Sequence, residues 1–204
     1  GNMTNIENRI AAAKDPNAST FEYTIQDITC FIPPKPSLRV YDSAWILLGS
    51  LQHLQTTMDV IKCFQSIHRV LSEDGTLIVE LSHPKETFNM LTCTRNTWEV
   101  PIDLDDGAEG TLKVLWGDES DEFDPIKQLR DLTVQFELDA GAFSTNVTQI
   151  IPTRLFTSQE MNALAYGGGF EVVQMYGSLN EDVDVYDTEL AYRMVCVLRK
   201  RKDL

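Results

Sequence analysis

Apolar residues recur along this chain with two different periods, which together define the expected helices and strands. Largely apolar runs at residues 44–48 and 76–81 are typical of strands that are buried on both faces. Between them, apolar residues fall at the three- and four-residue spacing of a helix, and Thr56 with Asp59 forms a capping box at its start. A strand, a helix and a second strand in this order predict a parallel pair joined by a crossover.

The same patterns predict further elements on both sides of this unit. Residues 3–13 have the spacing of an amphipathic helix, and residues 21–26 alternate as a strand does. Later in the chain, Thr157 and Glu160 form a second capping box, and the three glycines at 167–169 stop the helix that follows it. The last two strands are expected at residues 170–176 and 192–198.

Between these two α/β regions the pattern changes to short alternating segments separated by acidic turns. The segments lie at residues 112–116, 131–138 and 146–151, and they are typical of antiparallel hairpins. The sequence therefore predicts an α/β fold with a doubly wound, mostly parallel sheet and an antiparallel β lid inserted into it. Residues 1–97 would form the first part of the core, residues 98–149 the lid, and residues 150–204 the C-terminal part of the core sheet.

Composition narrows the classes of partner. The chain has 31 acidic and 17 basic residues among 204, a formal net charge of -14, so its field repels phosphate backbones and anionic lipid surfaces. We expect neither nucleic acid nor a membrane as partner, and no apolar run approaches the roughly 18 residues of a membrane span. The four cysteines lie far apart and the acidic runs lack calcium-loop spacing, which predicts a cytoplasmic protein without a metal site.

Two adjoining segments carry a resemblance to a known family. Residues 41–54 read YDSAWILLGSLQHL, and residues 69–80 read RVLSEDGTLIVE. The first resembles the fourth-strand signature of class I S-adenosylmethionine-dependent methyltransferases, and the second resembles the helix end, polar turn and fifth strand that follow it there. Two later segments, RLFTSQEM at residues 154–161 and GFEVV at residues 169–173, resemble the last helix and the sixth strand of the same family.

The resemblance implies a set of cofactor contacts. Asp27 corresponds to the acidic residue after the third strand, whose carboxylate accepts a hydrogen bond from the adenine amino group, with Ile28 beside the ring. Leu48, Gly49 and Ser50 would lie near the methionine end of S-adenosylmethionine, and Met3 would touch adenine. The alternative for Asp27 is that its side chain only caps a turn.

The resemblance also implies where the methyl acceptor binds. His53, just past the fourth strand, would orient or deprotonate a small-molecule acceptor, or else pack on the following helix. Trp98 would line the acceptor pocket or else pack in the core, and Arg154 would line the pocket with its guanidinium facing an anionic group. The expected reaction is methyl transfer to a nitrogen, oxygen or carbon nucleophile.

The beginning of the chain departs from the family pattern. The family opens with a strand and a glycine-rich turn whose amides hold the cofactor, and nothing before residue 21 resembles them. This departure predicts that the N-terminal strands of the family are missing, which would leave strand 44–48 as an apolar edge. We then expect further polypeptide, a partner chain or a homo-oligomer to complete the sheet. It also keeps open a non-catalytic, methyltransferase-like module that scaffolds a partner.

Overall fold

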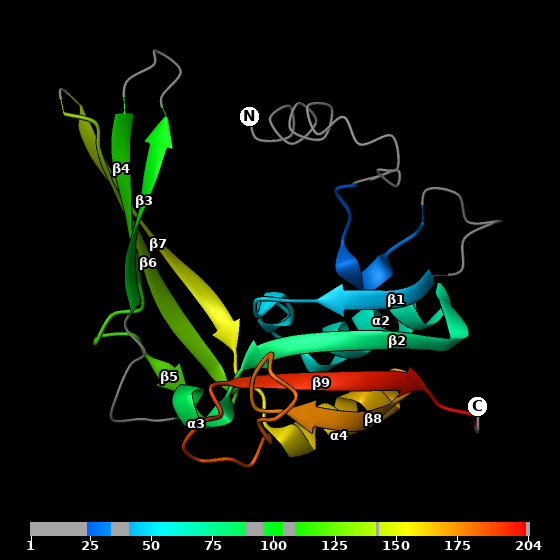
Figure 1. Cartoon of the computed structure of the whole chain (residues 1–204). Coiled ribbons are helices and arrows are strands. Elements are labelled where there is room, and N and C mark those ends of the chain that lie inside the picture. The colour runs from blue at the N-terminus through cyan, green and yellow to red at the C-terminus, as the bar shows by residue number, and fades with distance from the viewer. Residues whose placement is uncertain (1–23, 34–40, 89–95, 104–108, 142, 203–204) are drawn as a thin grey trace.

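Two β-sheets joined at one end make up the structure (Figure 1). It is a computed structural model that describes residues 24–33, 41–88, 96–103, 109–141 and 143–202. Sheet A contains four strands: β1 (Tyr41–Ile46), β2 (Leu71–Ser82), β9 (Arg193–Lys200) and β8 (Phe170–Tyr176), in that spatial order. Sheet B contains β3 (Asn96–Asp103), β4 (Glu109–Trp116), β5 (Phe123–Asp124), β6 (Leu129–Asp139) and β7 (Ser144–Arg154).

The predicted strand, helix, strand unit is present in sheet A. Strands β1 and β2 are parallel and are joined through α2 (Thr57–His68), which Thr56 caps by accepting a hydrogen bond from the Asp59 backbone amide at 3.1 Å. Strand β2 begins earlier than expected, because its first residues pair with the start of β1 across an irregularity in the register. The second predicted capping box starts α4 (Ser158–Gly167), where Thr157 accepts from the Glu160 amide.

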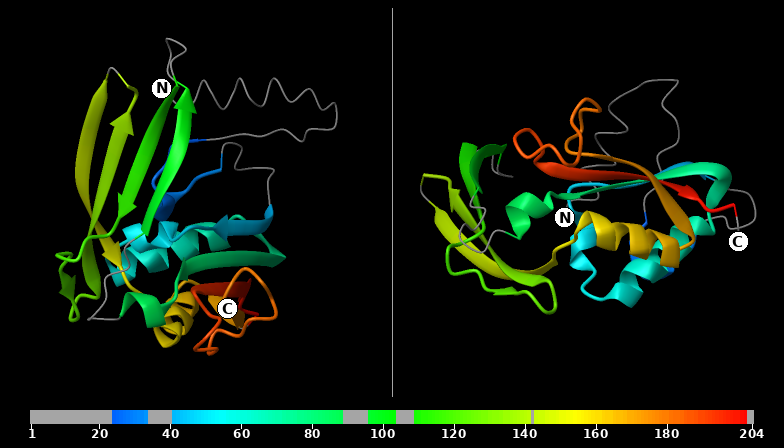
Figure 2. Two further views of the ribbon diagram at one scale, coloured as in Figure 1. Left: turned by 60° about the vertical axis from the view of Figure 1, so that its left-hand side comes forward. Right: turned by 90° about the horizontal axis from the view of Figure 1, so that it is seen from below.

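The expectation of a mostly parallel, doubly wound sheet is wrong for the described strands. Strand β9 is antiparallel to both β2 and β8, so β1 and β2 form the one parallel pair of sheet A. Strands β8 and β9 are joined by residues 177–192 without a helix, and a connection of that kind returns the chain as an antiparallel neighbour. The two long described helices, α2 and α4, lie together on one face of the sheet (Figure 2).

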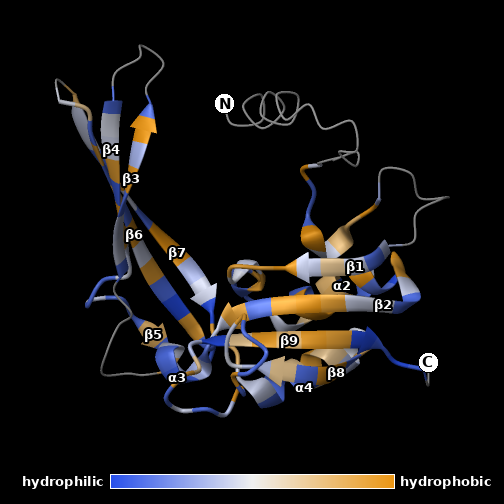
Figure 3. Ribbon diagram, viewed as in Figure 1, coloured by the Kyte–Doolittle hydropathy of each residue, from blue (hydrophilic) through white to orange (hydrophobic). Residues whose placement is uncertain are grey.

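The main core lies between sheet A and these two helices. Figure 3 shows apolar residues along most of β2 and β9, and Leu77, Val79 and Leu198 are fully buried. The ring of Phe64 on α2 meets that of Phe170 on β8 edge to face, with centroids 6.3 Å apart. Gly168, directly after α4, lets the backbone lie against Phe64, because a Cβ atom at this position would lie 2.4 Å from the Cβ of Phe64.

Sheet B is antiparallel throughout, and its longer strands contain the three alternating segments that the sequence indicated. Val114, Leu132 and Val134 form its own small core. The sheet rises from the carboxyl ends of β1 and β2, where the end of β7 contacts the 3₁₀ helix η2 (Ser50–His53) (Figure 1).

The strand expected at residues 21–26 is not formed in its described part. Residues 24–27 are irregular and lead into the 3₁₀ helix η1 (Ile28–Cys30). The side-chain amide of Gln26 accepts from the backbone amide of Ile32 at 2.9 Å and donates to its carbonyl at 3.0 Å. In a β-sheet, a neighbouring strand would bind these two backbone groups of Ile32. Here the side chain of Gln26 binds both of them, which closes a loop. The helix expected at residues 3–13, with Met3, lies outside the described residues.

None of the helices in the described ranges is long and apolar enough to cross a membrane.

Thiol reactivity tests the placement of the cysteines. Burial raises the pKa of both Cys63 and Cys196 to about 12, whereas Cys30 is exposed. Because the thiolate is the reactive form, we expect Cys30 to react with a disulfide reagent within seconds to minutes, and Cys63 and Cys196 only after unfolding in guanidinium. Mass-spectrometric mapping of labelled peptides measures this, with Cys30→Ser as the control. Rapid native labelling of Cys63 would contradict the packing of α2.

Candidate functional site

A left-handed turn follows directly on the carboxyl end of β1. Leu48 and Gly49 both have positive φ, +54° and +72°, and η2 starts at the next residue. The Ser50 amide and hydroxyl both donate to the Leu47 carbonyl, at 3.1 and 2.7 Å, which closes the turn. A positive φ is unusual for leucine, and the surrounding structure has to hold it in place. The side chain of Leu48 is 80% exposed, so burial of that side chain is not what holds it.

The buried carboxylate of Glu80 holds this turn. Glu80 lies near the carboxyl end of β2, is 2% exposed, and accepts from the Leu48 amide through Oε2 at 3.1 Å. Its backbone carbonyl accepts from the Gly49 amide at 3.2 Å. Arg193 on β9 provides the opposite charge, with its Nε 3.4 Å from Oε1 of Glu80. The ion pair with Arg193 offsets part of the cost of burying the Glu80 carboxylate away from water. The carboxylate can therefore lie under the turn and bind the Leu48 amide.

Gln52 joins the same turn to three strands. Its side chain is buried at 6% exposure, and its Nε2 donates to the carbonyl of Arg154, the last residue of β7, at 3.1 Å. Its Oε1 accepts from the hydroxyl and the amide of Ser82, the last residue of β2, at 3.2 and 3.4 Å. The end of β1, the end of β2 and the end of sheet B therefore meet at one amide group.

Gly49 is required by both its backbone and its surroundings. Besides the positive φ, a Cβ atom at this position would lie 2.5 Å from Oε1 of Gln52. The glycine thus lets the turn lie directly on the Gln52 amide.

His53 and Arg154 lie on either side of Gln52 in different environments. His53 ends η2 and is exposed at the carboxyl end of sheet A. Arg154 is 4% exposed, and its Nη2 donates to the carboxylate of Glu160 and to the hydroxyl of Thr57. Its guanidinium also lies 5.0 Å from the centre of the Phe156 ring. Arg154 thus ties the end of β7 to the first turns of α2 and α4.

Asp27 caps η1, which is the alternative that the sequence left open. Its Oδ1 accepts from both the amide and the hydroxyl of Thr29, each at 2.8 Å, and these bonds lower the pKa of the carboxyl group. Ile28 is 42% exposed, and its carbonyl accepts from Ser66 in the second half of α2 at 3.1 Å. These contacts attach Asp27 and Ile28 to α2 rather than to the Leu48 turn.

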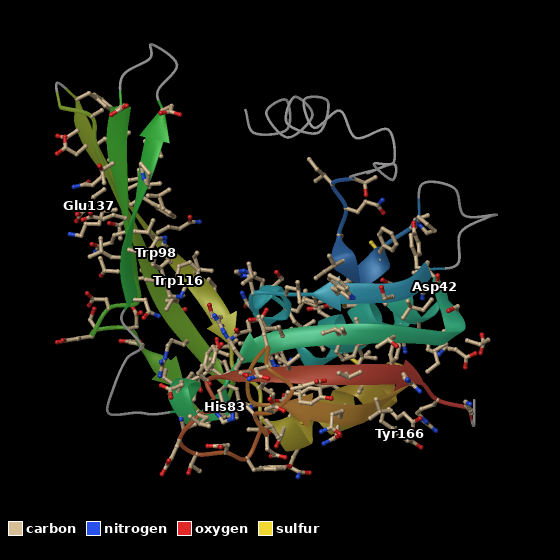
Figure 4. The ribbon with its side chains drawn as sticks, viewed as in Figure 1. Asp42, His83, Trp98, Trp116, Glu137 and Tyr166 are labelled. Atoms are coloured by element: carbon tan, nitrogen blue, oxygen red, sulfur yellow. The ribbon has the colours of Figure 1, made fainter. Side chains whose placement is uncertain are left out.

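Trp98 lies on sheet B with a second indole beside it. The ring centres of Trp98 on β3 and Trp116 on β4 are 6.4 Å apart, and Trp98 is 44% exposed. Figure 4 shows both indoles on the side of sheet B that is turned toward sheet A.

His83, the residue after β2, is buried. Its Nε2 lies 2.8 Å from the Val185 carbonyl, and its Nδ1 accepts from the Lys85 amide.

Sequence analysis missed Gln52 and Glu80, the two buried polar residues that shape the turn. Glu80 interrupts the apolar run at residues 77–81, and Gln52 follows Leu51 and comes two residues before Leu54. A polar residue inside an apolar run is the signal that was present, since such a residue is buried only with partners. The partners themselves, Arg154 and Ser82, are remote in sequence.

A scan of the sequence against models of protein families found no match, and a search among curated proteins found none either.

Comparison with solved structures identifies the fold. A S-adenosylmethionine-dependent methyltransferase from Clostridium acetobutylicum superposes with a TM-score of 0.73 at 15% identity, over 97% of this chain and 70% of its own. The CcbJ methyltransferase from Streptomyces caelestis gives 0.68 at 16% identity, over 97% and 75%. The sugar N-methyltransferase KedS8 from Streptoalloteichus gives 0.58 at 15%, over 86% and 61%. The described α/β core and its antiparallel sheet therefore have the fold of these methyltransferases.

The Gln52 amide should be important for stability as well as for the shape of the turn. Replacing Gln52 with leucine keeps the size of the side chain but leaves the carbonyl of Arg154 and the hydroxyl of Ser82 without these partners. We expect a loss of roughly 1 to 3 kcal/mol in the free energy of unfolding, the usual cost of unpaired buried polar groups. Urea unfolding followed by circular dichroism measures it. Gln55→Leu, at a nearby exposed position, is the control, and an equal effect of both variants would contradict the role of Gln52.

Proposed function

We propose that this chain takes part in methyl transfer from S-adenosylmethionine to a small-molecule nucleophile. The observation that carries the proposal is the left-handed turn at Leu48 and Gly49, held by Glu80 at the carboxyl end of the parallel pair β1 and β2. Open α/β sheets bind their ligands at this end of the parallel strands. The fold shared with methyltransferases supports the same location.

The reaction requires little from the protein beyond position and one proton acceptor. The nucleophile forms a bond to the methyl carbon as the bond from that carbon to the sulfonium sulfur breaks, and the acceptor loses a proton. In-line positioning supplies most of the rate enhancement in such a displacement. We assign the proton to His53, whose imidazole is exposed beside the turn and offers a ring nitrogen as the proton acceptor.

On the cofactor side, we assign the adenine contact to Asp27 and Ile28. Hydrogen bonds from Thr29 lower the pKa of the Asp27 carboxyl group, so this group is an ionised acceptor near neutral pH, as binding of an exocyclic amine requires. The exposed side chain of Ile28 would provide an apolar wall for the ring. Leu48, Gly49 and Ser50 would line the methionine end.

On the acceptor side, sheet B supplies an apolar surface rather than a charged one. Trp98 and Trp116 offer two indole faces to a flat or aliphatic part of the acceptor. Arg154 is buried and its Nη2 already binds Glu160 and Thr57, so we assign acceptor binding to the more exposed Trp98. KedS8 is described as a sugar N-methyltransferase, and an amino sugar is one acceptor that such a surface could hold.

Strand β1 is an open edge of sheet A, and this edge is where further polypeptide could complete the cofactor site. Among the described strands β1 pairs only with β2. Trp45 on β1 is 66% exposed, and Leu47 and Leu48, just beyond its end, are 37% and 80% exposed. A long apolar edge is a hazard that folded proteins cover. We propose that further polypeptide pairs with this edge and supplies the amides that hold the cofactor's carboxylate and ribose. The same edge supports the second candidate function, a non-catalytic module that scaffolds a partner.

Binding of S-adenosylhomocysteine to the 204-residue chain separates these possibilities. If the remaining amides lie on other polypeptide, the chain should bind weakly, with saturation transfer from the protein to the adenine protons but no binding in the micromolar range by calorimetry. Asp27→Ala should reduce the affinity roughly tenfold, because the adenine amine loses its acceptor. Asp42→Ala, at the opposite end of β1, is the matched control.

One result would count against the proposed reaction, and another would count against the proposal that further polypeptide completes the site. The absence of saturation transfer from wild-type protein at all concentrations would favour the scaffold function. Micromolar affinity combined with methyl transfer by this chain would show that the described residues already build a complete site.

A further inference from the structure

Strand β7 is an edge strand that lacks the usual protection against pairing. It pairs with β6 along eleven residues without a bulge, and its other side pairs with no described strand. Every residue from Ser144 to Ile150 is exposed, so neither face of this part of the strand is covered. Phe143, Val147 and Ile150 are 58%, 57% and 62% exposed. Edge strands are normally short, bulged, charged or interrupted by proline, and residues 144–151 of this strand have none of these features.

The absence of charge distinguishes this stretch from most of the chain. The chain has a formal net charge of -14, which repels a second copy from most of its surface. Residues 140–153, in contrast, contain no aspartate, glutamate, lysine or arginine. An uncharged edge on a strongly acidic protein is a part of the surface where a second copy meets little repulsion.

The direction of the backbone groups follows from the two ends of the β6–β7 ladder. The Ala140 amide donates to the Phe143 carbonyl at 2.8 Å, and the Leu155 amide donates to the Gln128 carbonyl at 2.8 Å. Because bonded and non-bonded pairs alternate along an antiparallel ladder, the odd-numbered residues of β7 bond to β6. The even-numbered residues therefore direct their amides outward, which leaves four donors on the open edge: Ser144, Asn146, Thr148 and Ile150.

Pro152 agrees with this assignment. It is the next even-numbered residue and has no amide hydrogen, so its place in the outward row costs the β6 ladder nothing. It also marks the end of the row of outward donors.

We infer that two copies of this chain associate by antiparallel pairing of their β7 edges about a two-fold axis at Val147. In that register Ser144 opposes Ile150 of the second copy and Asn146 opposes Thr148. Each of the four outward amides then meets an outward carbonyl, and Pro152 lies outside the paired region. The partner is a second copy because the segment is uncharged and because this register is self-complementary. The inference is independent of the proposed function.

Molar mass in solution tests the association. Light scattering after size exclusion should give twice 23.1 kDa for the 204-residue chain at micromolar concentrations. Thr148→Pro removes one outward amide from each copy and should reduce the mass to 23.1 kDa, as should Thr148→Lys, which adds like charges across the axis. Gln135→Lys is the matched control, since Gln135 pairs with Thr148 one strand further in, and it should leave the dimer intact.

A cysteine at the axis tests the register. Val147 opposes its own copy in a non-hydrogen-bonded pair, in which Cα atoms lie about 4.5 Å apart, so Val147→Cys should form an intermolecular disulfide under mild oxidation. Thr145→Cys, which would oppose Gln149, and the wild-type chain are the controls and should remain uncrosslinked.

A monomeric wild-type chain would overturn the inference. So would a dimer that survives both Thr148 variants, because that dimer would use another surface such as the open edge of β1. Circular dichroism of each variant shows whether sheet B is still folded. If Thr148→Pro unfolds it, the comparison of Thr148→Lys with Gln135→Lys decides the question.

Discussion

The side-chain amide of Gln52 is the contact on which the rest of the arrangement depends. It binds the carbonyl at the end of β7 and the terminal residue of β2, while its own backbone follows the turn after β1. Glu80 fixes the other side of that turn through the Leu48 amide. Because both groups are buried, water does not compete for their bonds, and three strand ends are held in one geometry. The position of sheet B relative to sheet A follows from this junction.

The junction explains why an exposed leucine can remain in a left-handed conformation. A positive φ at Leu48 costs free energy, and because its side chain is exposed, burial of that side chain does not offset this cost. The bond from its amide to Glu80 and the closing bonds from Ser50 compensate for this cost. A strained, well-supported turn at the carboxyl end of a parallel pair is typical of a site where a ligand approaches the backbone closely. This turn is the observation on which we propose that the methionine end of the cofactor binds there.

Local patterns in the sequence predicted most of the elements, because their signals lie within a few residues. The capping boxes at Thr56 and Thr157, the strand at residues 170–176 and the alternating segments of sheet B are of this kind. The antiparallel direction of β9 and the irregular conformation of residues 24–26 depend instead on contacts that the local pattern does not specify. The bonds of Gln52 to Arg154 and of Glu80 to Arg193 were likewise invisible, since nothing local to either residue specifies its partner.

Amide chemical shifts measured during a titration with S-adenosylhomocysteine test the central claim most directly. The titration uses the 15N-labelled 204-residue chain, at ligand concentrations high enough for weak binding. The account predicts shifts at Leu48, Gly49 and Ser50, together with shifts at Asp27 and Ile28, which would show that the turn and η1 bind one ligand. Shifts confined to β8 and β9, or to sheet B, would contradict it.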